Sequence, residues 1–398
     1  MGPAVKHMAT TSYDSCNELL KAMIAFDTVN SKLSGQPDAE AELARHLDET
    51  AKALGFATLR LPVTDGSFNL LILHEVRADA PWLLFESHLD TVSAANMTIP
   101  PFGGEIREGR IYGRGACDTK GTGAAMLWAL KRYASECEGP NNIAILYSID
   151  EEVGATGIGA FANEQLPQLA WRPIGAIVGE PTELKPVVAH NGSIRLTIET
   201  HGVAAHSCDP SRGRSAISMM VKVIEAIESR YIPNLTATHP LTGKAQCSIN
   251  VIEGGVQSNV IPARCTITID RRLVPGEDGQ TVQPALERIL DDLRQEHPEL
   301  TAVQSKPRIG NPLDPSVTGA FADAVCGVFE ELGMPSEPSG EPYGTDGGAL
   351  SSVGLPTVVV GPGNIAQAHT KDEWLDLAEF NRGVDVYLAL MRSALNCS

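Results

Sequence analysis

Residues 82–90 read WLLFESHLD, a short apolar run followed by polar side chains. Trp82 to Phe85 has the length of a strand, and its unbroken apolar character predicts a strand buried on both faces. Ser87-His88-Leu89-Asp90 then follows at the carboxyl end of that strand. In an open parallel sheet this is the edge at which ligands bind.

Metal-competent side chains follow other predicted strands in the same way. A strand over 142–147 precedes Glu151 and Glu152, one over 175–178 precedes Glu180, and one over 356–360 precedes His369. Asp118 lies in a glycine-rich loop, residues 113–121, just before a predicted helix. Since the carboxyl ends of neighbouring parallel strands meet at one edge, we expect these residues to converge.

The same alternation of elements predicts the fold class. Helical patterns over 17–26, 39–54 and 124–133 are interspersed with the buried strands and a further one over 69–73. This order is typical of an α/β domain with a mixed, mostly parallel sheet flanked by helices.

A region with a different hydrophobic pattern interrupts this series of elements. Residues 194–199 and 266–270 alternate apolar with polar side chains, as strands with one wet face do. Its elements are a strand (194–200), a helix (216–230), two strands (246–253 and 264–271), a helix (282–295) and a strand near 300–304. This β-α-β-β-α-β order predicts a ferredoxin-like α+β domain, 191–305, inserted into a domain formed by 1–190 and 306–398.

The composition excludes several classes of function. The 398 residues carry 31 Lys and Arg against 49 Asp and Glu, a net charge of -18 that opposes contact with nucleic acid or anionic lipid. No run approaches the roughly 20 apolar residues of a membrane span. The eight cysteines form no CxxC pair, which favours reduced thiols and a cytoplasmic location.

The predicted edge cluster suits a metal site. Two histidines with several carboxylates form a borderline ligand set for Zn²⁺ or Co²⁺, and Mn²⁺ is also compatible. Because Glu151 and Glu152 are adjacent, one could be a ligand and the other a base. Taken alone, each of these features has a simpler interpretation. The His-X-Asp segment after the strand could be a hydrogen-bonded pair, and the adjacent glutamates could lie in a solvated loop. Glu180 could cap a helix or a turn, and His369 could be a surface histidine.

Five segments together resemble a known family. They are 87–92 (SHLDTV), 113–121 (GRGACDTKG), 150–154 (DEEVG), 179–182 (GEPT) and 368–369 (AH). In order and spacing they are similar to the M20 family of dinuclear-zinc aminoacylases and peptidases, and the match covers essentially the whole chain. The inserted domain looks like that family's lid and dimerisation domain.

The resemblance implies a role for each matched residue. His88, Asp118 and Glu180 would hold one metal ion, and Asp118, Glu152 and His369 the other. Asp90 would fix the tautomer of His88. Glu151 would be the general base that takes a proton from water and passes it to the departing amine.

In the lid, the resemblance implies that His206 stabilises the oxyanion from across a homodimer, although a lid-surface histidine is the simpler alternative. Asn259 and Arg272 match positions that hold substrate, and Arg272 could grip a carboxylate with two hydrogen bonds. An arginine that ends a strand is otherwise a solvated charge. Gly363 would offer backbone contacts beside the metals.

Within the family, residues 344–348 and 361–373 are most similar to the acetylornithine and acetylcitrulline deacetylases, except that Asp346 stands where those enzymes are expected to have glutamate. We therefore expect hydrolysis of an N-acyl amino acid, with N-acetylornithine first. The alternatives are a dipeptidase or carboxypeptidase, a succinyl-diaminopimelate desuccinylase type of enzyme, and a non-catalytic binding protein. A dinucleotide-binding enzyme is rejected because Gly121-Thr122-Gly123 lacks the third glycine, Met126 standing in its place.

Overall fold

The computed structural model describes residues 12–136 and 139–395 and divides the chain into two compact units. The first unit contains the residues up to Val188, Pro315–Ser339 and those from Thr345 on. The second contains Ala189–Asp314 and Gly340–Gly344. Cys137 and Cys397 lie outside the described residues.

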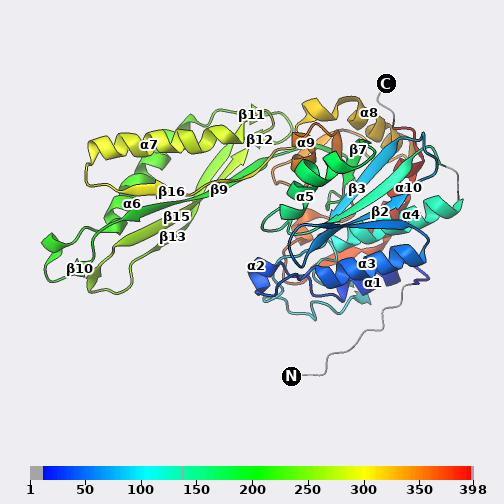
Figure 1. Cartoon of the computed structure of the whole chain (residues 1–398), viewed down its shortest axis with the longest axis horizontal. Helices are drawn as coiled ribbons and strands as arrows, with labels where there is room; N and C mark the ends of the chain where they lie inside the picture. The colour runs from blue at the N-terminus through cyan, green and yellow to red at the C-terminus, as the bar shows by residue number, and fades with distance from the viewer. Residues whose placement is uncertain (1–11, 137–138, 396–398) are drawn as a thin grey trace. The chain divides into compact units, whose positions relative to one another are not determined.

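The strands of the first unit form its centre (Figure 1). They are β1 (Ala57–Pro62), β2 (Phe68–His74), β3 (Trp82–His88), β4 (Glu105–Arg107), β5 (Arg110–Tyr112), β6 (Asn142–Ser148), β7 (Pro173–Val178), β8 (Val187–His190), β18 (Ser339–Glu341), β19 (Thr357–Val359) and β20 (Trp374–Asp376). Of these, β8 and β18 begin in the first unit and end in the second. Eight of these form one sheet in the order β1-β2-β6-β3-β7-β19-β8-β18, while β20, β5 and β4 form a small separate sheet.

The large sheet is mixed. Its centre is parallel, because β3 pairs in parallel with β6 and β7, and β19 with β7. The flanking pairs β1–β2, β2–β6 and β19–β8 are antiparallel. All seven residues of β6 are buried, as predicted for a strand covered on both faces.

The helices of this unit cover both faces of the sheet. They are α1 (Cys16–Ile24), α2 (Ser31–Ser34), α3 (Ala41–Ala53), α4 (Lys120–Glu136), α5 (Thr156–Ala160), α8 (Pro315–Glu331), α9 (Gly347–Ser352) and α10 (Leu377–Arg392). One face packs its apolar residues, including Phe85 and Ile145, into a core with α1, α3, α4, α8 and α10. The patterns over 17–26, 39–54 and 124–133 correspond to α1, α3 and α4, whereas α8 and α10 were not predicted.

The second unit has an antiparallel sheet with two helices. Its elements are β9 (Gly192–His201), β10 (Ala205–His206), α6 (Ala216–Ala226), β11 (Thr238–His239), β12 (Gly243–Lys244), β13 (Gln246–Gly254), β14 (Val260–Ile261), β15 (Arg264–Leu273), α7 (Val282–Glu296), β16 (Ala302–Gln304) and β17 (Arg308–Gly310). The sheet order is β13-β15-β9-β16, and β17 also pairs with β9. Buried and less buried residues alternate along β15, so one face of the sheet forms the core with α6 and α7.

The unit boundaries differ from the predicted ones at 190/191 and 305/306. The second unit continues past residue 305 because β17 joins its sheet and Leu313 exchanges two backbone hydrogen bonds with His190. The short segment 340–344 also belongs to it, and Asn191 donates a backbone hydrogen bond to Glu341 there. Such contacts between distant segments leave no periodic signal in the sequence.

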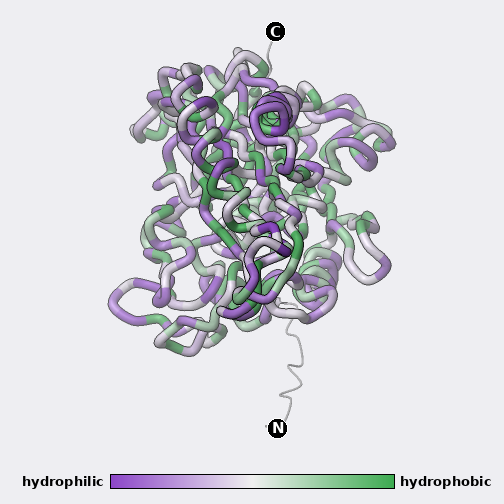
Figure 2. The backbone as a smooth tube through the Cα atoms, turned by 90° about the vertical axis from the view of Figure 1, so that its left-hand side faces the viewer, coloured by the Kyte–Doolittle hydropathy of each residue, from purple (hydrophilic) through white to green (hydrophobic). Residues whose placement is uncertain are grey.

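Among residues 12–136 and 139–395, no helix is both long and apolar enough to cross a bilayer. Figure 2 shows the same property along the tube, where hydrophobic stretches are repeatedly interrupted by hydrophilic ones.

Candidate metal centre

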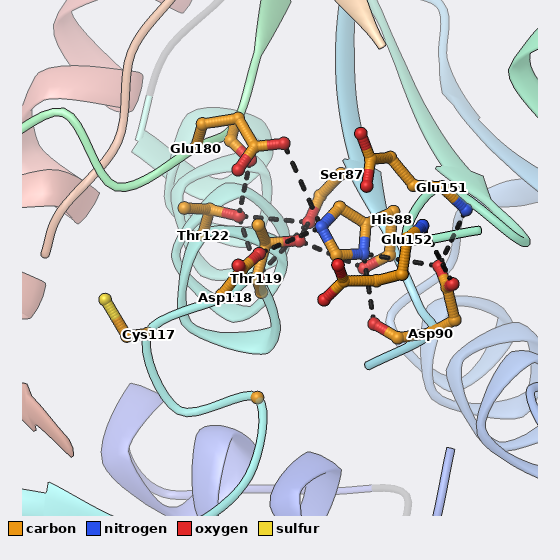
Figure 3. Close-up of polar contacts among 12 residues, drawn as sticks. Ser87, His88, Asp90, Cys117, Asp118, Thr119, Thr122, Glu151, Glu152 and Glu180 are labelled. Carbon is orange, nitrogen blue, oxygen red and sulfur yellow. Dashed lines mark hydrogen bonds and ion pairs between the residues drawn. The ribbon is translucent and has the colours of Figure 1, made fainter. Parts of the chain in front are cut away.

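The predicted residues converge at one edge of the large sheet, in the first unit. His88 ends β3, Glu151 and Glu152 follow β6, and Glu180 follows β7. These strands are neighbours and the pairs β3–β6 and β3–β7 are parallel, so their carboxyl ends meet. Asp118 reaches the same edge from the loop before α4, and in Figure 3 the side chains of Asp118 and Glu180 lie beside the ring of His88.

A first group consists of His88, Asp118 and Glu180, all three buried. The Nε2 atom of His88 lies 3.1 Å from Oδ1 of Asp118 and 3.9 Å from Oε1 of Glu180. One potential ligand atom from each residue lies within 4.8 Å of the others. The three atoms therefore surround a space of the size that a metal ion requires.

A second group consists of Asp118, Glu152 and His369, again with ligand atoms within 4.8 Å of one another. Nε2 of His369 is 3.2 Å from Oδ2 of Asp118 and 3.1 Å from Oε2 of Glu152. The two oxygens of Asp118 thus face different histidines, Oδ1 toward His88 and Oδ2 toward His369. This is the geometry of a carboxylate that bridges two ions.

The tautomer of His88 is set by Asp90, but chiefly through its backbone. Nδ1 of His88 lies 3.0 Å from the carbonyl oxygen of Asp90 and 3.4 Å from its carboxylate Oδ1. A hydrogen bond from Nδ1–H to this carbonyl would direct Nε2 toward Asp118, where it can bind a metal once its own proton is released. Asp90 was expected to fix the tautomer of His88, and its peptide oxygen lies nearer to Nδ1 than its carboxylate does.

The carboxylate of Asp90 has a further task, which is to hold the turn after β6. Oδ1 accepts the backbone N–H of Glu151 at 2.9 Å, and Oδ2 accepts that of Glu152 at 3.1 Å. Asn30 adds a side-chain hydrogen bond to Oδ2 at 2.8 Å. Asp90 is fully buried, so it fixes the backbone from which both glutamates project. Asn30 was not predicted as a site residue, and nothing in its local sequence marks it as one.

The electrostatics of the cluster show an excess of negative charge. Burial raises the pKa of Glu180 well above its usual range, and the nearby Asp118 charge adds to this effect. Burial likewise raises the pKa of Glu152 to about 7. Hydrogen bonds that His369 donates to the carboxylates of Asp118 and Glu152 raise its pKa to about 10. The carboxylates are thus short of positive charge, and protonated histidines partly supply it.

Two divalent cations fit this donor set. Each group offers one imidazole nitrogen and two carboxylates, the mixture that Zn²⁺ and similar ions bind. A cation would provide the positive charge that the carboxylates lack, and the histidine protons would be released. The residues present are therefore chemically suited to a dinuclear centre.

His206, the predicted oxyanion donor, and Asn259, a predicted substrate residue, lie close together in the second unit. His206 lies on β10, which pairs with β14 so that His206 is opposite Val260. The N–H of Ser207 donates a hydrogen bond to the carbonyl oxygen of Asn259 at 3.0 Å, which places Asn259 beside His206. Both side chains are exposed.

Arg272 already holds a carboxylate of the protein. Its Nε lies 2.7 Å from Oδ1 of Asp270, and its Nη2 lies 3.3 Å from Oδ2, the forked pairing that had been predicted for a substrate. Both residues line a cavity of about 410 Å³ within the second unit. A substrate carboxylate would have to share the guanidinium with Asp270 or displace it.

The backbone of Gly363, which was expected to offer contacts beside the metals, makes its hydrogen bonds within the protein. Its N–H donates to Oε1 of Glu379 at 3.0 Å, and its carbonyl accepts the N–H of Glu183 at 2.8 Å. Its φ of +102° is a conformation that favours glycine, and a Cβ there would lie 2.6 Å from Sγ of Cys117. Gly363 therefore permits a tight turn and close packing beside the Asp118 loop.

Comparisons with known proteins agree with this geometry. Acetylornithine deacetylase of Proteus mirabilis (strain HI4320) is 30% identical over 374 residues, which cover 91% of this chain and 92% of that protein. The metallo-carboxypeptidase Sso-CP2 from Sulfolobus solfataricus, an M20 family member, superposes with a TM-score of 0.77 at 18% identity, covering 96% of this chain and 100% of that chain.

The aminopeptidase PepT from Bacillus cereus has a TM-score of 0.74 at 19% identity, over 97% of this chain and 99% of that chain. These two structures establish the shared fold. Residues 84–393 match the sequence profile of peptidase family M20/M25/M40, and they include every residue of the candidate metal centre. The chain therefore belongs to peptidase family M20/M25/M40, a family of metal-dependent hydrolases.

Proposed function

We propose that this protein is a dinuclear amidohydrolase that removes the acyl group from an N-acyl amino acid, with N-acetylornithine as the first candidate substrate. The observation that carries the proposal is Asp118, whose two oxygens face His88 and His369 and so join the two ligand groups. The 30% identity to an acetylornithine deacetylase supports the choice of substrate.

In this proposal His88, Asp118 and Glu180 hold one ion, and Asp118, Glu152 and His369 hold the other. Zn²⁺ or Co²⁺ is preferred and Mn²⁺ is compatible with the donor set. When bound, such ions act as Lewis acids on the amide carbonyl and increase the acidity of water.

Glu151 would be the general base. Its backbone N–H donates a hydrogen bond to Asp90, directly before the ligand Glu152. It would take a proton from the attacking water and later deliver it to the departing amine nitrogen. His206 would donate a hydrogen bond to the oxyanion, and Asn259 and Arg272 would bind the substrate.

The proposal includes a homodimer formed through the second unit. β13 is at the edge of the sheet order, and its Val251 and Ile252 are 47% and 55% exposed. An exposed apolar edge strand is a surface that pairing with another chain would cover. A fully active monomer would contradict donation of His206 from one subunit to the other.

A cytoplasmic location is also part of the proposal. The six cysteines among the described residues are free thiols, which suits a reducing compartment.

The experiment that tests the proposal measures metal content and hydrolysis on a panel of substrates with added Zn²⁺ or Co²⁺. The panel contains N-acetylornithine, N-acetylcitrulline, N-acetylmethionine, N-succinyl-diaminopimelate and dipeptides. Two ions per chain and a strong preference for N-acetylornithine are expected. Preference for a dipeptide or the succinyl compound would keep the mechanism and change the substrate, and failure to bind metal would refute the proposal.

Two variants test the residue roles. Glu151→Gln should keep both ions while kcat falls by about 10² to 10⁴, the usual contribution of a general base. Near-native kcat would overturn that role. Arg272→Ala should raise KM for substrates with a free α-carboxylate more than for the corresponding amides, and equal effects would argue against a carboxylate contact.

A further inference from the structure

The segment after His369 lies directly against the loop that carries Asp118. β20 pairs antiparallel with β5, with Trp374 opposite Tyr112. The pairing continues into the adjoining loops, since the N–H of Gly113 donates to the carbonyl oxygen of Glu373 at 3.0 Å. This register places Glu373, which is fully buried, against residues 113–118.

The carboxylate of Glu373 accepts four hydrogen bonds from that loop. Oε1 accepts the backbone N–H of Cys117 at 2.8 Å and that of Asp118 at 3.0 Å. Oε2 accepts the N–H of Gly115 at 3.1 Å and Nη1 of Arg114 at 2.7 Å. An ionised carboxylate has about four acceptor positions, so all of them are used.

Arg114 extends this network to the loop of the second histidine. It is 3% exposed, and its Nη2 donates to the carbonyl oxygens of Ser93 at 2.9 Å and of Thr370 at 3.1 Å. Thr370 directly follows His369. One buried ion pair therefore connects the backbone of Asp118 with the backbone beside His369.

We propose that Glu373 and Arg114 are positioning residues of the metal centre, which hold Asp118 and His369 at the separation that two ions require. The inference rests on the proposed dinuclear function. It gives a role to two residues that are not among the predicted ligands. A rotation of Asp118 about its backbone would move its oxygens away from one histidine or both. The hydrogen bond from the N–H of Asp118 to Glu373 opposes that rotation.

The chemistry of the pair supports positioning over simple packing. A buried ion pair often stabilises a protein no more than apolar residues of similar volume would. What apolar residues could not do is accept three backbone N–H groups of one loop at fixed positions. Outer partners of this kind typically change metal affinity by about 10- to 100-fold when they are removed.

The test is metal affinity of the full-length protein, measured by competition between the protein and a chelator for Zn²⁺. Glu373→Gln keeps the size of the side chain but replaces one carboxylate oxygen with an NH₂ group. That NH₂ group must then face two hydrogen-bond donors that the oxygen accepted. Because Asp118 belongs to both ligand groups, we expect the affinity for both ions to fall at least 10-fold. Asp372→Asn is the matched control, since Asp372 lies in the same segment, is only partly buried and accepts a hydrogen bond from Thr98 instead.

A second variant covers the case in which Glu373→Gln does not fold. Arg114→Lys keeps a positive charge beside Glu373 but removes the Nη2 group that donates a hydrogen bond to the carbonyl oxygen of Thr370. We expect the ion in the His369 group to bind at least 10-fold more weakly, while the ion in the His88 group changes less than threefold.

A merely structural role predicts a different result. Folded Glu373→Gln or Arg114→Lys protein with wild-type affinity for both ions, and with its Tm lowered equally in chelator and in excess Zn²⁺, would overturn the inference. If the wild-type protein itself binds no Zn²⁺, the proposed function fails first. The two failures are therefore distinguishable in one experiment.

Discussion

Asp90→Asn is the substitution that most directly tests how the site is built. The Asp90 carboxylate accepts three hydrogen bonds, from the backbone N–H groups of Glu151 and Glu152 and from Asn30. An asparagine keeps one oxygen only. If that oxygen takes the Oδ2 position, where two donors meet, the NH₂ group must face the N–H of Glu151.

The magnitude follows from this geometry. One buried donor left without an acceptor costs about 1–3 kcal/mol, and the lost charge weakens the two remaining bonds. A loss of about 2 kcal/mol corresponds to a fall in Tm of about 4–8 °C for a domain of this size. Because the turn carries both a ligand and the proposed base, kcat/KM should fall by about 10- to 100-fold.

The assay is thermal unfolding in the presence of chelator, so that metal binding does not mask the loss, together with hydrolysis of N-acetylornithine with added Zn²⁺. Asp385→Asn is the control, since it removes an exposed carboxylate paired with Arg132 and should cost less than about 1 kcal/mol. An Asp90→Asn protein with unchanged Tm and unchanged kcat/KM would refute the reasoning that Asp90 holds the Glu151 turn.

Two further predictions concern the second unit. Glu277→Gln should destabilise the second unit by about 3 kcal/mol, because the substitution leaves Arg271, which is 2% exposed, without its ion pair. Denaturant unfolding followed by a probe in that unit should detect this loss, and a change below about 1 kcal/mol would contradict the prediction. Burial lowers the pKa of His190 to about 4 from 6.5, so the unfolded chain binds a proton between pH 6.5 and 4 that the folded chain does not. Stability should therefore fall by up to about 3 kcal/mol as the pH falls through that window. His190→Gln should flatten this part of the profile, and an unchanged slope would show that His190 is not responsible.

Much of the fold could be predicted from local patterns. The unbroken apolar run of β6 and the alternating pattern of β15 distinguish a sheet covered on both faces from one covered on a single face. The order of elements in the second unit follows from the same periodicities. The antiparallel pairing of β2 with β1 and β6 could not be predicted, because a buried strand has the same apolar pattern in either direction.

The candidate site divides in a similar way. The ligand types and their place after the strands are visible in the sequence, since His88, Glu152 and Glu180 each follow an apolar run. The contact between Arg272 and Asp270 was accessible in principle, because residues two apart on a strand share a face. The two interpretations given for Arg272 were a substrate contact and a solvated charge, and neither includes a carboxylate on the same strand.

The sequence by itself determined the family, the order of the elements and the chemical character of the donors, because these depend on residue type and short-range periodicity. Only the tertiary structure decided that Asp118 faces two histidines and that Glu373 accepts the N–H of a residue 255 positions earlier in the chain. The physical reason is that such contacts depend on strand register and on the path of loops. Both are set by packing of the whole unit, and no local pattern of residues encodes them.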